Sequence, residues 1–500
     1  MYHRLLTLLL CALLTGCTGG GEAGGSSAAP TATATAPVQG TVTAIGLSDS
    51  GVTVDGQAAS TDPSTAVYVG GDIIYYQDGT DQTYGEGEEG EKHTAQEAAA
   101  HTLVTITQPG TYRLSGTLAK GQIAVDLGPA AKDDPAAVVT LILDNANVTC
   151  TVAPALIFYH VYECDRDFVA YGKGENAGYQ PLATVDTTAA GANVVLAAGT
   201  QNTFTGSHVA RIYQPGTTEN LHRYDGAFYS CMSMNIFGDN GDDTGVLNIV
   251  ADNEGLDSEL HLTLNGGAIH IDSQDDGINT NEDNVSVTTV NGGSLTVNAG
   301  QGAEGDGIDS NGYLVINGGS VVTMSNDRSA DGGIDADRDI LINGGTLAAF
   351  GTRNDAVSRD SAQAFLEFYL AAPLSAGSVV ELKDGEGNLL WSGTAQRAYQ
   401  SVTLSLPGLS AEGSYQLYAD GQLQENSGQG RGFGPEGGRP GDGGTPPQPP
   451  EGFEPGNMEG ERPQPPEGFE PGQFEGERPQ GGRGGHGPAP AGEERGADAS

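Results

Sequence analysis

The tripeptide Asn-Gly-Gly recurs at a fixed spacing and constrains the fold more than any other feature of the sequence. It begins at Asn265, Asn291, Asn317 and Asn343, so that each copy follows the last by 26 residues. Short β-prone runs flank every copy, and many of their positions alternate between apolar and small polar residues. Strands this close together, with no helical segment between them, exclude βαβ units. The repeat therefore predicts an all-β, right-handed parallel β-helix, a solenoid whose coils each carry a few short strands.

The Asn-Gly-Gly turn has the residue types that a sharp bend between two strands requires. Glycine accepts a positive φ without penalty, and Asn tolerates the left-handed region better than other residues that carry a Cβ. Stacked coils should also bring the four Asn side chains into an amide ladder along the axis. We therefore assign these Asn residues a structural role and no catalytic one.

A second pattern recurs away from these turns and combines acidic residues with glycine and one aliphatic residue. Its copies begin at Glu254, Asp276, Asp306 and Gly332, and a weaker copy begins at Asp355. The aliphatic residue should point into the core and the flanking oxygens should point outward. Acidic side chains are therefore expected to stack from coil to coil.

Stacked carboxylates repel each other, so this pattern predicts a bound cation. Strands about 4.8 Å apart place two unit charges where they repel by roughly 1 kcal/mol in water and more when partly buried. No Lys or Arg lies between Tyr224 and Asp327 to offset this repulsion. Raised carboxyl pKa values, or a solvated acidic ridge with diffuse counterions, are the alternatives. Oxygen-only ligands suit Ca²⁺ rather than zinc. The predicted calcium ligands are Asp257, Asp275, Asp276, Asp306, Asp309, Asp331 and Asp335.

The N-terminus has the pattern of an exported lipoprotein. His3 and Arg4 precede an apolar run that is too short to span a membrane, and Leu14-Thr15-Gly16-Cys17 has the pattern of a bacterial lipobox. We expect residues 1–16 to be a signal peptide and Cys17 to carry a lipid that anchors the secreted chain to the outer face of a bacterial membrane. Ordinary signal cleavage near Gly24 is the alternative.

Composition divides the rest of the chain. Residues 17–39 are rich in Gly, Ala, Ser and Thr, which suits a flexible tether. The β-helix is expected over residues 40–360, and a β-rich C-terminal cap or subdomain over 361–426. Residues 427–500 are dominated by Gly, Pro and Glu, a composition that predicts a disordered tail. Residues 94–101 predict a short helix at the N-terminal end of the stack, with Thr94 as its cap.

The charge balance excludes some partners. Lys and Arg total 21 against 65 Asp and Glu, a formal charge of −44, which argues against nucleic acid and against an anionic membrane surface. Any membrane contact should therefore occur through the lipid alone. Cys150, Cys164 and Cys231 cannot all pair within the chain and lack zinc-site spacing. We expect free, buried thiols and a monomeric protein.

Several ordered motifs resemble those of clostridial carbohydrate-binding β-helix proteins. They are Gly-Thr-Tyr-Arg-Leu-Ser-Gly-Thr-Leu at 110–118, Gly-Gln-Ile-Ala-Val-Asp at 121–126, Cys-Thr-Val-Ala-Pro-Ala at 150–155 and Asp-Gly-Ile-Asp-Ser-Asn-Gly at 306–312. The resemblance covers roughly residues 100–350. It implies a pectate-lyase-like fold, bound calcium, and non-catalytic binding of acidic plant polysaccharides such as polygalacturonate, and also of cellulose. It further implies that Asp306, Asp309 and their equivalents in the other coils are calcium ligands.

The first functional hypothesis is non-catalytic, calcium-dependent binding of an acidic polysaccharide at the cell surface. Calcium would bridge protein carboxylates to uronate carboxylates, which allows an acidic protein to bind an acidic polymer. Aromatic side chains in loops are candidates for stacking on sugars, although each is equally consistent with packing. These candidates are Tyr213, Tyr224 and Tyr229, with Phe158, Tyr159 and Tyr162 as further loop aromatics.

Two alternatives remain open. A calcium-dependent polysaccharide lyase needs Arg or Lys beside the metal as a base, and the central acidic coils contain neither. Four arginines, Arg328, Arg338, Arg353 and Arg359, flank the last coils, and hydrolysis by paired carboxylates is a variant. The other alternative is a structural or adhesive rod in which calcium stiffens the coils. We expect the chain not to be an enzyme.

Overall fold

The computed structural model describes residues 35–38 and 40–427. The predicted signal peptide with Cys17, most of the predicted tether, and the predicted tail from residue 428 onward lie outside the described residues.

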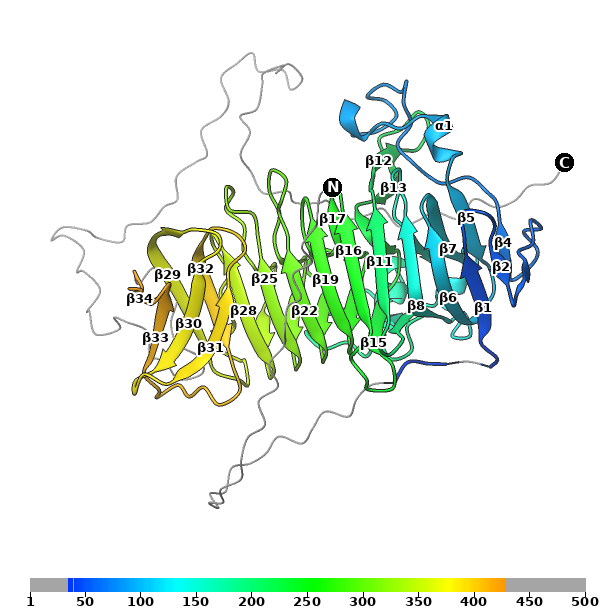
Figure 1. Cartoon of the computed structure of the whole chain (residues 1–500). Helices are drawn as coiled ribbons and strands as arrows, with labels where there is room; N and C mark the ends of the chain where they lie inside the picture. The colour runs from blue at the N-terminus through cyan, green and yellow to red at the C-terminus, as the bar shows by residue number, and fades with distance from the viewer. Residues whose placement is uncertain (1–34, 39, 428–500) are drawn as a thin grey trace, which may run out of the picture. The chain divides into compact units, whose positions relative to one another are not determined.

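The chain winds into coils, and each complete coil contributes one strand to each of three parallel columns (Figure 1). The first column comprises β1 (Thr43–Leu47), β6 (Gly110–Leu118), β8 (Val139–Thr149), β10 (Ala192–Leu196), β15 (Met234–Gly238), β18 (His261–Leu264), β21 (Val287–Val290), β24 (Tyr313–Ile316) and β27 (Ile340–Ile342). The predicted parallel β-helix is confirmed.

The second column begins with the C-terminal ends of β6 and β8, which are long enough to belong to both columns. It continues through β11 (Gln201–Gly206), β16 (Val246–Ala251), β19 (Ala268–Ser273), β22 (Ser294–Asn298), β25 (Ser320–Met324) and β28 (Thr346–Gly351). Apolar side chains alternate along these strands and fill the interior, as the period-2 pattern predicts.

The third column is a separate nine-stranded sheet, and it carries the acidic repeat. Its parallel strands are β5 (Thr102–Ile106), β7 (Gly121–Asp126), β9 (Leu156–His160), β14 (Gly226–Ser230), β17 (Glu254–Ser258), β20 (Ile278–Thr280), β23 (Ile308–Ser310) and β26 (Asp335–Ala336). The strand β4 (Val67–Val69) closes its N-terminal edge in antiparallel orientation.

The Asn-Gly-Gly turns connect the first column to the second and form the expected amide ladder. The three later Asn side chains each donate an amide to the Asn one coil earlier, at 2.9 Å from Asn291 to Asn265, from Asn317 to Asn291 and from Asn343 to Asn317. The second glycine of each turn has a positive φ between 74° and 87°. A Cβ at Gly293 would lie 2.3 Å from the carbonyl oxygen of the turn below, so stacking as well as φ requires glycine there.

Antiparallel strands end the stack at its C-terminal side. The strand β32 (Tyr399–Ser405) pairs with β28, and β29 (Phe365–Leu374) pairs with β32. A four-stranded sheet of β30 (Val379–Asp384), β31 (Leu389–Thr394), β33 (Tyr415–Ala419) and β34 (Gln422–Leu423) packs with them around its own apolar cluster. The open edge of the second column is thereby covered.

Short elements cover the other end and the loops. They are β2 (Thr53–Val54), β3 (Gln57–Ala58), η1 (Glu89–Glu91), α1 (Ala95–Ala98), η2 (Ala131–Asp133), α2 (Arg166–Gly172), β12 (Val209–Tyr213) and β13 (Asn220–Tyr224). The helix α1 lies within the predicted segment, and Thr94 and Glu97 form a reciprocal capping box at its start. Cys150 is buried, Cys164 and Cys231 are partly buried, and all three are free thiols. No helix in the described ranges is long and apolar enough to cross a membrane.

Candidate metal centre

The acidic repeat stacks in the register that its sequence predicts. Asp257, Asn279, Asp309 and Asp335 follow one another in adjacent strands of the third column. The aliphatic residue before each of them is fully buried. Because successive side chains of a strand point to opposite faces, these four polar side chains face away from the core. They form a polar column, which we call the acidic column.

Three carboxylates from two consecutive coils converge at one end of this column. Asp225 lies in the link between β13 and β14, Glu254 begins β17, and Asp257 lies within the same strand. One carboxylate oxygen from each lies within 4.8 Å of the others. The three residues are only 6%, 4% and 0% exposed, although a solvated acidic ridge would leave them accessible. We call this group the acidic triad.

Several oxygens in and beside the triad have no hydrogen-bond donor. Asn279 donates to Glu254 Oε1 and Asn281 donates to Asp257 Oδ1, each at 3.1 Å. Glu254 Oε2, Asp257 Oδ2 and Asn279 Oδ1 are buried and have no hydrogen-bond partner in the described part of the chain. While both acids are ionised, each such orphaned acceptor costs about 1–3 kcal/mol, and a proton shared between Glu254 and Asp257 relieves part of this cost. A cation held by the triad would satisfy the carboxylate oxygens of Glu254 and Asp257.

Burial and mutual repulsion favour the protonated forms of these acids. Burial, followed by the charges of Asp225 and Asp275, raises the pKa of Glu254 to about 8. The pKa of Asp257 is raised well above its usual value by burial and by Glu254 and Glu259. Metal-ligating carboxylates must be ionised, so a bound cation would have to displace these protons.

A guanidinium group partly neutralises the triad. Arg223 Nε lies 2.5 Å from Asp225 Oδ2. Three ionised carboxylates and this one guanidinium leave a formal charge of −2, which a divalent cation balances. Burial lowers the pKa of Arg223, but the charges of Asp225 and Glu254 outweigh it and raise that pKa overall. Arg223 therefore stays protonated beside the triad.

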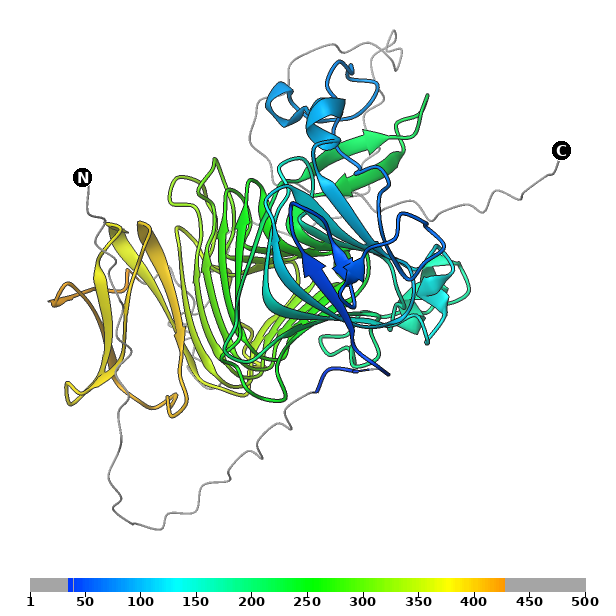
Figure 2. The ribbon, with the colours of Figure 1, turned by 45° about the vertical axis from the view of Figure 1, so that its right-hand side comes forward.

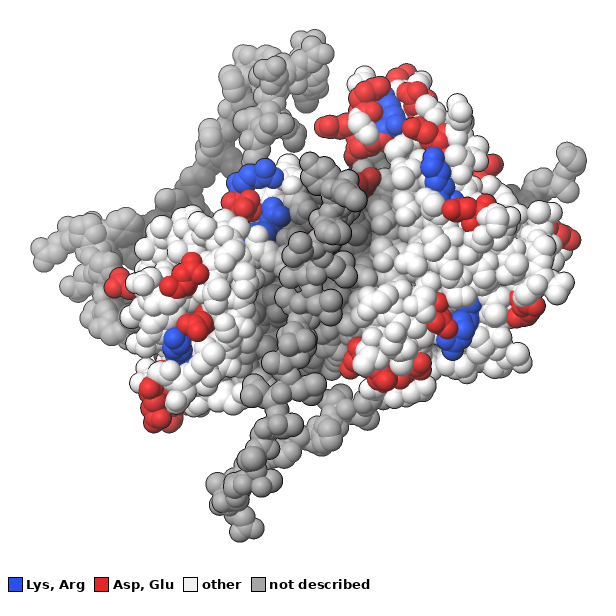
Figure 3. All heavy atoms as spheres, in the orientation of Figure 1, with Lys and Arg blue, Asp and Glu red and all other residues white. Residues whose placement is uncertain are grey.

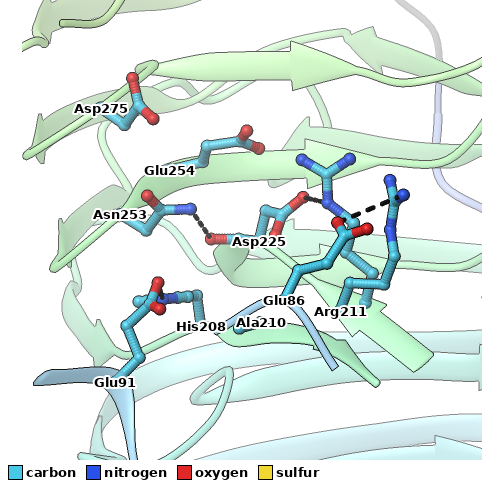
Figure 4. A pocket seen from close by; sticks show the side chains of 10 residues that line it. Glu86, Glu91, His208, Ala210, Arg211, Asp225, Asn253, Glu254 and Asp275 are labelled. Carbon is cyan, nitrogen blue, oxygen red and sulfur yellow. Dashed lines mark hydrogen bonds and ion pairs between the residues drawn. The ribbon is translucent and has the colours of Figure 1, made fainter. Parts of the chain in front are cut away.

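Asp225 and Glu254 of the triad line a pocket with a volume of about 360 Å³ (Figure 4). Asp225, Glu254 and Asp275 form its wall on the side of the coils, and Figure 4 shows their carboxylates beside Asn253. The opposite wall comes from the segment that precedes α1 and from the hairpin β12–β13. That wall comprises Glu86, Glu91, His208, Ala210, Arg211 and Arg223.

The residues present fit a hard divalent cation. Carboxylate and amide oxygens are the donor set of Ca²⁺, which takes six to eight oxygen ligands. No Cys or His belongs to the group, so the soft and borderline ligands typical of zinc are missing from it. Asp225, Glu254 and Asp257 would hold the ion, with Asn279 as a neutral fourth donor.

A comparison with known protein families assigns the chain to a family. The sequence profile of a family described as "Carbohydrate-binding domain-containing protein" matches residues 100–177 and 181–416, more than half of the chain. The chain belongs to this family. The matched ranges contain the acidic triad and the whole acidic column.

Other comparisons add little to the family assignment. A solved structure titled "Structure of the polysaccharide lyase-like protein from C. thermocellum, Gadolinium derivative" aligns with 61% of this chain and 94% of its own. The two share 19% sequence identity, with a TM-score of 0.34. No curated protein matches the sequence.

The seven predicted calcium ligands of this carbohydrate-binding domain do not form one site. Asp257 belongs to the acidic triad, and Asp275 lines the pocket beside it. Asp275 has a pKa raised to about 7 by burial and by Glu304 and Asp331. Asp276 directly follows Asp275 and is close enough to Glu254 for the two charges to interact. The other four predicted ligands, Asp306, Asp309, Asp331 and Asp335, lie in later coils.

Burial and neighbouring carboxylates raise the pKa values of Asp276, Asp306, Asp309 and Asp335. Burial raises the pKa of Asp309 to about 7 and that of Asp335 to about 8, with further contributions from neighbouring carboxylates. Backbone amides satisfy some of the remaining oxygens. Asp276 Oδ1 accepts from the Asp306 backbone at 2.6 Å, and Asp331 Oδ2 accepts from the Gly305 backbone at 2.7 Å. These residues lie outside the triad. The orphaned oxygens of Glu254, Asp257 and Asn279 lie in the triad or beside it.

Two of the three tyrosines expected to contact glycan belong to the core instead. Tyr224 is 7% exposed and Tyr229 is 0% exposed. Their rings pack edge to face at 5.3 Å, and Tyr159 packs against Tyr224 at 5.6 Å. A buried ring presents no face to a sugar, so the expectation is corrected for both. Tyr213 remains partly exposed and donates its hydroxyl to Glu86.

The sequence repeats did not indicate Asp225, Arg223 or Arg211, and they placed Glu254 in the acidic repeat without predicting it as a ligand. Asp225-Gly226 does precede a strand that ends in Ser230, much as Asp276-Gly277 precedes Ile278-Asn279-Thr280. The copy at Asp225 contains one extra residue, because Gly226 pairs with Glu254 rather than with Gly255. Arg223 stands directly before the stretch without basic residues, and no repeat indicates where Arg211 lies.

Figure 3 shows how unevenly charge is distributed on one face of the molecule. The surface over β6, β8 and β11 carries few charged side chains, whereas acidic ones gather on the projecting segment that includes α1. That segment contributes Glu86 and Glu91 to the pocket. Charge therefore concentrates where the pocket wall forms.

Proposed function

We propose that this protein binds an acidic polysaccharide such as polygalacturonate through calcium, without cleaving it. The observation that carries the proposal is the set of orphaned oxygens on Glu254, Asp257 and Asn279, which lie beside a pocket. Family membership supports carbohydrate as the ligand. Cellulose, a neutral glycan, is a second ligand to test.

The coordination chemistry of calcium explains how a protein of charge −44 could bind a polyanion. Asp225, Glu254 and Asp257 supply only part of the six to eight oxygens that Ca²⁺ takes. Water or ligand oxygens would complete the shell from the pocket side. A uronate carboxylate is a suitable donor, since it brings negative charge to a cation that the protein holds.

A calcium-dependent lyase is the second candidate, because Arg211 and Arg223 lie in the wall of the same pocket. β-Elimination needs a base that removes the proton α to the uronate carboxylate. The raised pKa of Arg223 opposes its loss of a proton, which makes it a poor base. Binding without cleavage is therefore the proposal that the electrostatics favour.

Affinity electrophoresis in gels containing polygalacturonate tests the proposal. We expect calcium-dependent retardation that a chelator abolishes, and no increase in the absorbance of unsaturated products. Asp257→Asn should lose the retardation, whereas Glu412→Gln, an exposed change outside the pocket, should keep it. Unsaturated products would establish the lyase instead. No retardation on polygalacturonate or cellulose would favour the adhesive or structural rod.

We further propose that a lipid on Cys17 anchors the monomeric protein to the outer face of a bacterial membrane. The lipobox pattern before Cys17 and the proposed binding of an extracellular polymer support this location. Cys17→Ser in the full chain should release the protein from the membrane fraction and abolish labelling with a radioactive fatty acid. Unchanged fractionation and labelling would contradict the proposal.

A further inference from the structure

Two segments far apart in the sequence build the outer wall of the pocket. Gly85 pairs with Ile212 of β12 as an antiparallel bridge, and the Glu86 backbone donates to the Arg211 carbonyl at 2.9 Å. Figure 2 shows the hairpin β12–β13 beside the segment that carries α1. The pairing holds Glu86 and Arg211 next to each other above the triad.

Arg211 has an incomplete set of partners. Its Nε atom is buried and has no hydrogen-bond partner among the described residues. Its NH1 atom lies 3.4 Å from Glu86 Oε2, the long end of an ion pair, and the Glu86 side chain is 51% exposed. An Arg guanidinium has a rigid fork of donors that matches a carboxylate in bidentate geometry. The ion pair with Glu86 engages NH1 at long range and leaves Nε without a partner.

We propose that Arg211 is the residue that recognises the carboxylate of a uronic acid unit, and that Glu86 occupies its place in the unliganded protein. The inference rests on the proposed function and deepens it. A ligand carboxylate would replace Glu86 at Arg211, and Glu86 would turn to solvent. The exchange leaves the charge at Arg211 unchanged, since one carboxylate replaces another.

The distribution of charge in the pocket favours a monoanionic sugar. Arg211 stands on the outer wall, and Asp225, Glu254 and Asp275 form the inner wall. A dianion such as a phosphate ester would meet strong repulsion from these acids. A uronate has one negative charge, and its neutral hydroxyl groups can accept or donate hydrogen bonds to the remaining wall.

Glu86 makes the proposal testable, because its removal should have the opposite effect to that of Arg211. The Tyr213 hydroxyl donates to Glu86 Oε1 and helps to keep it at Arg211. Glu86→Gln weakens this internal competitor and removes one negative charge from the pocket. Affinity for an anionic sugar should then increase, while Arg211→Gln should decrease it.

The experiment is calorimetric titration of the full chain, loaded with calcium, with trigalacturonate and with its methyl ester. We expect Arg211→Gln to weaken trigalacturonate binding by about tenfold or more, as for a lost charge-assisted hydrogen bond. Arg211→Lys should recover only part of the affinity, because Lys lacks the planar fork. Glu86→Gln should bind several-fold more tightly than the wild type, and the ester should bind weakly to every form.

Lys120→Gln is the control, since it removes a positive charge from an exposed turn outside the pocket. Calcium binding, titrated separately, should persist in Arg211→Gln and show that this variant is folded. If the wild type binds trigalacturonate and neither pocket substitution changes its affinity, the role of Arg211 is wrong and the proposed function stands. If the wild type does not bind trigalacturonate at all, both are overturned.

Discussion

Two ladders of polar side chains run along the same coils. They differ in whether the stacked side chains can form hydrogen bonds with one another. In the Asn ladder, Asn291, Asn317 and Asn343 each donate an amide to the preceding Asn at 2.9 Å. In the acidic column, Asp257, Asn279, Asp309 and Asp335 stack in the same way. An amide both donates and accepts, whereas an ionised carboxylate only accepts.

Only one of the two ladders is a candidate binding site. The Asn ladder satisfies itself from coil to coil and needs nothing from outside. The acidic column leaves buried oxygens of Asp257 and Asn279 without donors, and a buried oxygen of Glu254 in the adjoining triad lacks one too. Burial raises the carboxyl pKa values of Asp257, Asp309 and Asp335. Stacked carboxylates are stable only when they are protonated or bind a cation. The acidic column therefore requires one of these two partners.

The largest expected effect comes from giving the triad a donor. Glu254→Gln should lower calcium affinity by more than the roughly 100-fold that loss of an outer-shell partner can cost. Above pH 8, where Glu254 is ionised, the same change should stabilise the calcium-free protein by about 1–3 kcal/mol, because the amide supplies a donor to Asp257 Oδ2 that the carboxylate lacks. Calorimetric calcium titration and thermal unfolding in chelator measure the two effects.

Opposite signs in these two measurements distinguish a metal site from an ordinary packing contact. Glu412→Gln, on the exposed surface, should change neither quantity. A Glu254→Gln protein that loses stability in chelator while it keeps its calcium affinity would show that the comparison between the ladders is mistaken.

The second effect is a dependence of stability on pH that calcium reverses. Carboxyl pKa values are raised to about 8 at Glu254 and Asp335 and to about 7 at Asp275 and Asp309. Between pH 5 and pH 8 the folded state therefore binds more protons than the unfolded chain, and stability falls as pH rises.

In chelator, the thermal midpoint should decrease as the pH rises from 5 to 8. Calcium should oppose this decrease, since it binds the ionised forms, and a hundredfold excess over its dissociation constant contributes about 2.7 kcal/mol. Differential scanning calorimetry at several pH values, with and without calcium, measures both. A midpoint in chelator that rises with pH over this range would contradict the burial of ionisable acids.

The smallest effect is expected when the Asn ladder is made to resemble the acidic column. Asn317→Asp removes the donor to Asn291 and places two acceptors face to face, which should cost about 1–3 kcal/mol at neutral pH. Below pH 4 the protonated Asp can donate again, so much of the loss should be recovered. Urea unfolding at both pH values, with Asn317→Ala as the uncharged comparison, measures the difference. An equal loss in the two variants would remove the role of charge.

Much of the fold could be predicted because a repeat fixes its own register. The 26-residue spacing of Asn-Gly-Gly placed the turns, and the amide ladder follows from stacking them. The acidic repeat likewise predicted that Asp257, Asn279, Asp309 and Asp335 share a column. The repeat pattern was sufficient to predict both ladders, since equivalent residues of adjacent coils lie next to each other wherever the coils stack.

The site itself could be predicted only in part. Asp257 was expected as a calcium ligand, but its partners Glu254 and Asp225 were not, and the seven expected ligands are spread along the column. Whether an acid in a repeat is solvated or buried depends on what covers it. Here the covering segments lie outside the repeat.

What the sequence alone determined is therefore the coil, its turns and the existence of an acidic column. The place along that column where the oxygens lose their donors, and the place where a pocket forms, depend on how the chain folds in three dimensions. The segment with Glu86 and the hairpin with Arg211 meet through backbone hydrogen bonds between residues more than 120 positions apart. Such pairing leaves no periodic signal in the sequence, because it depends on how the chain folds back rather than on how it repeats.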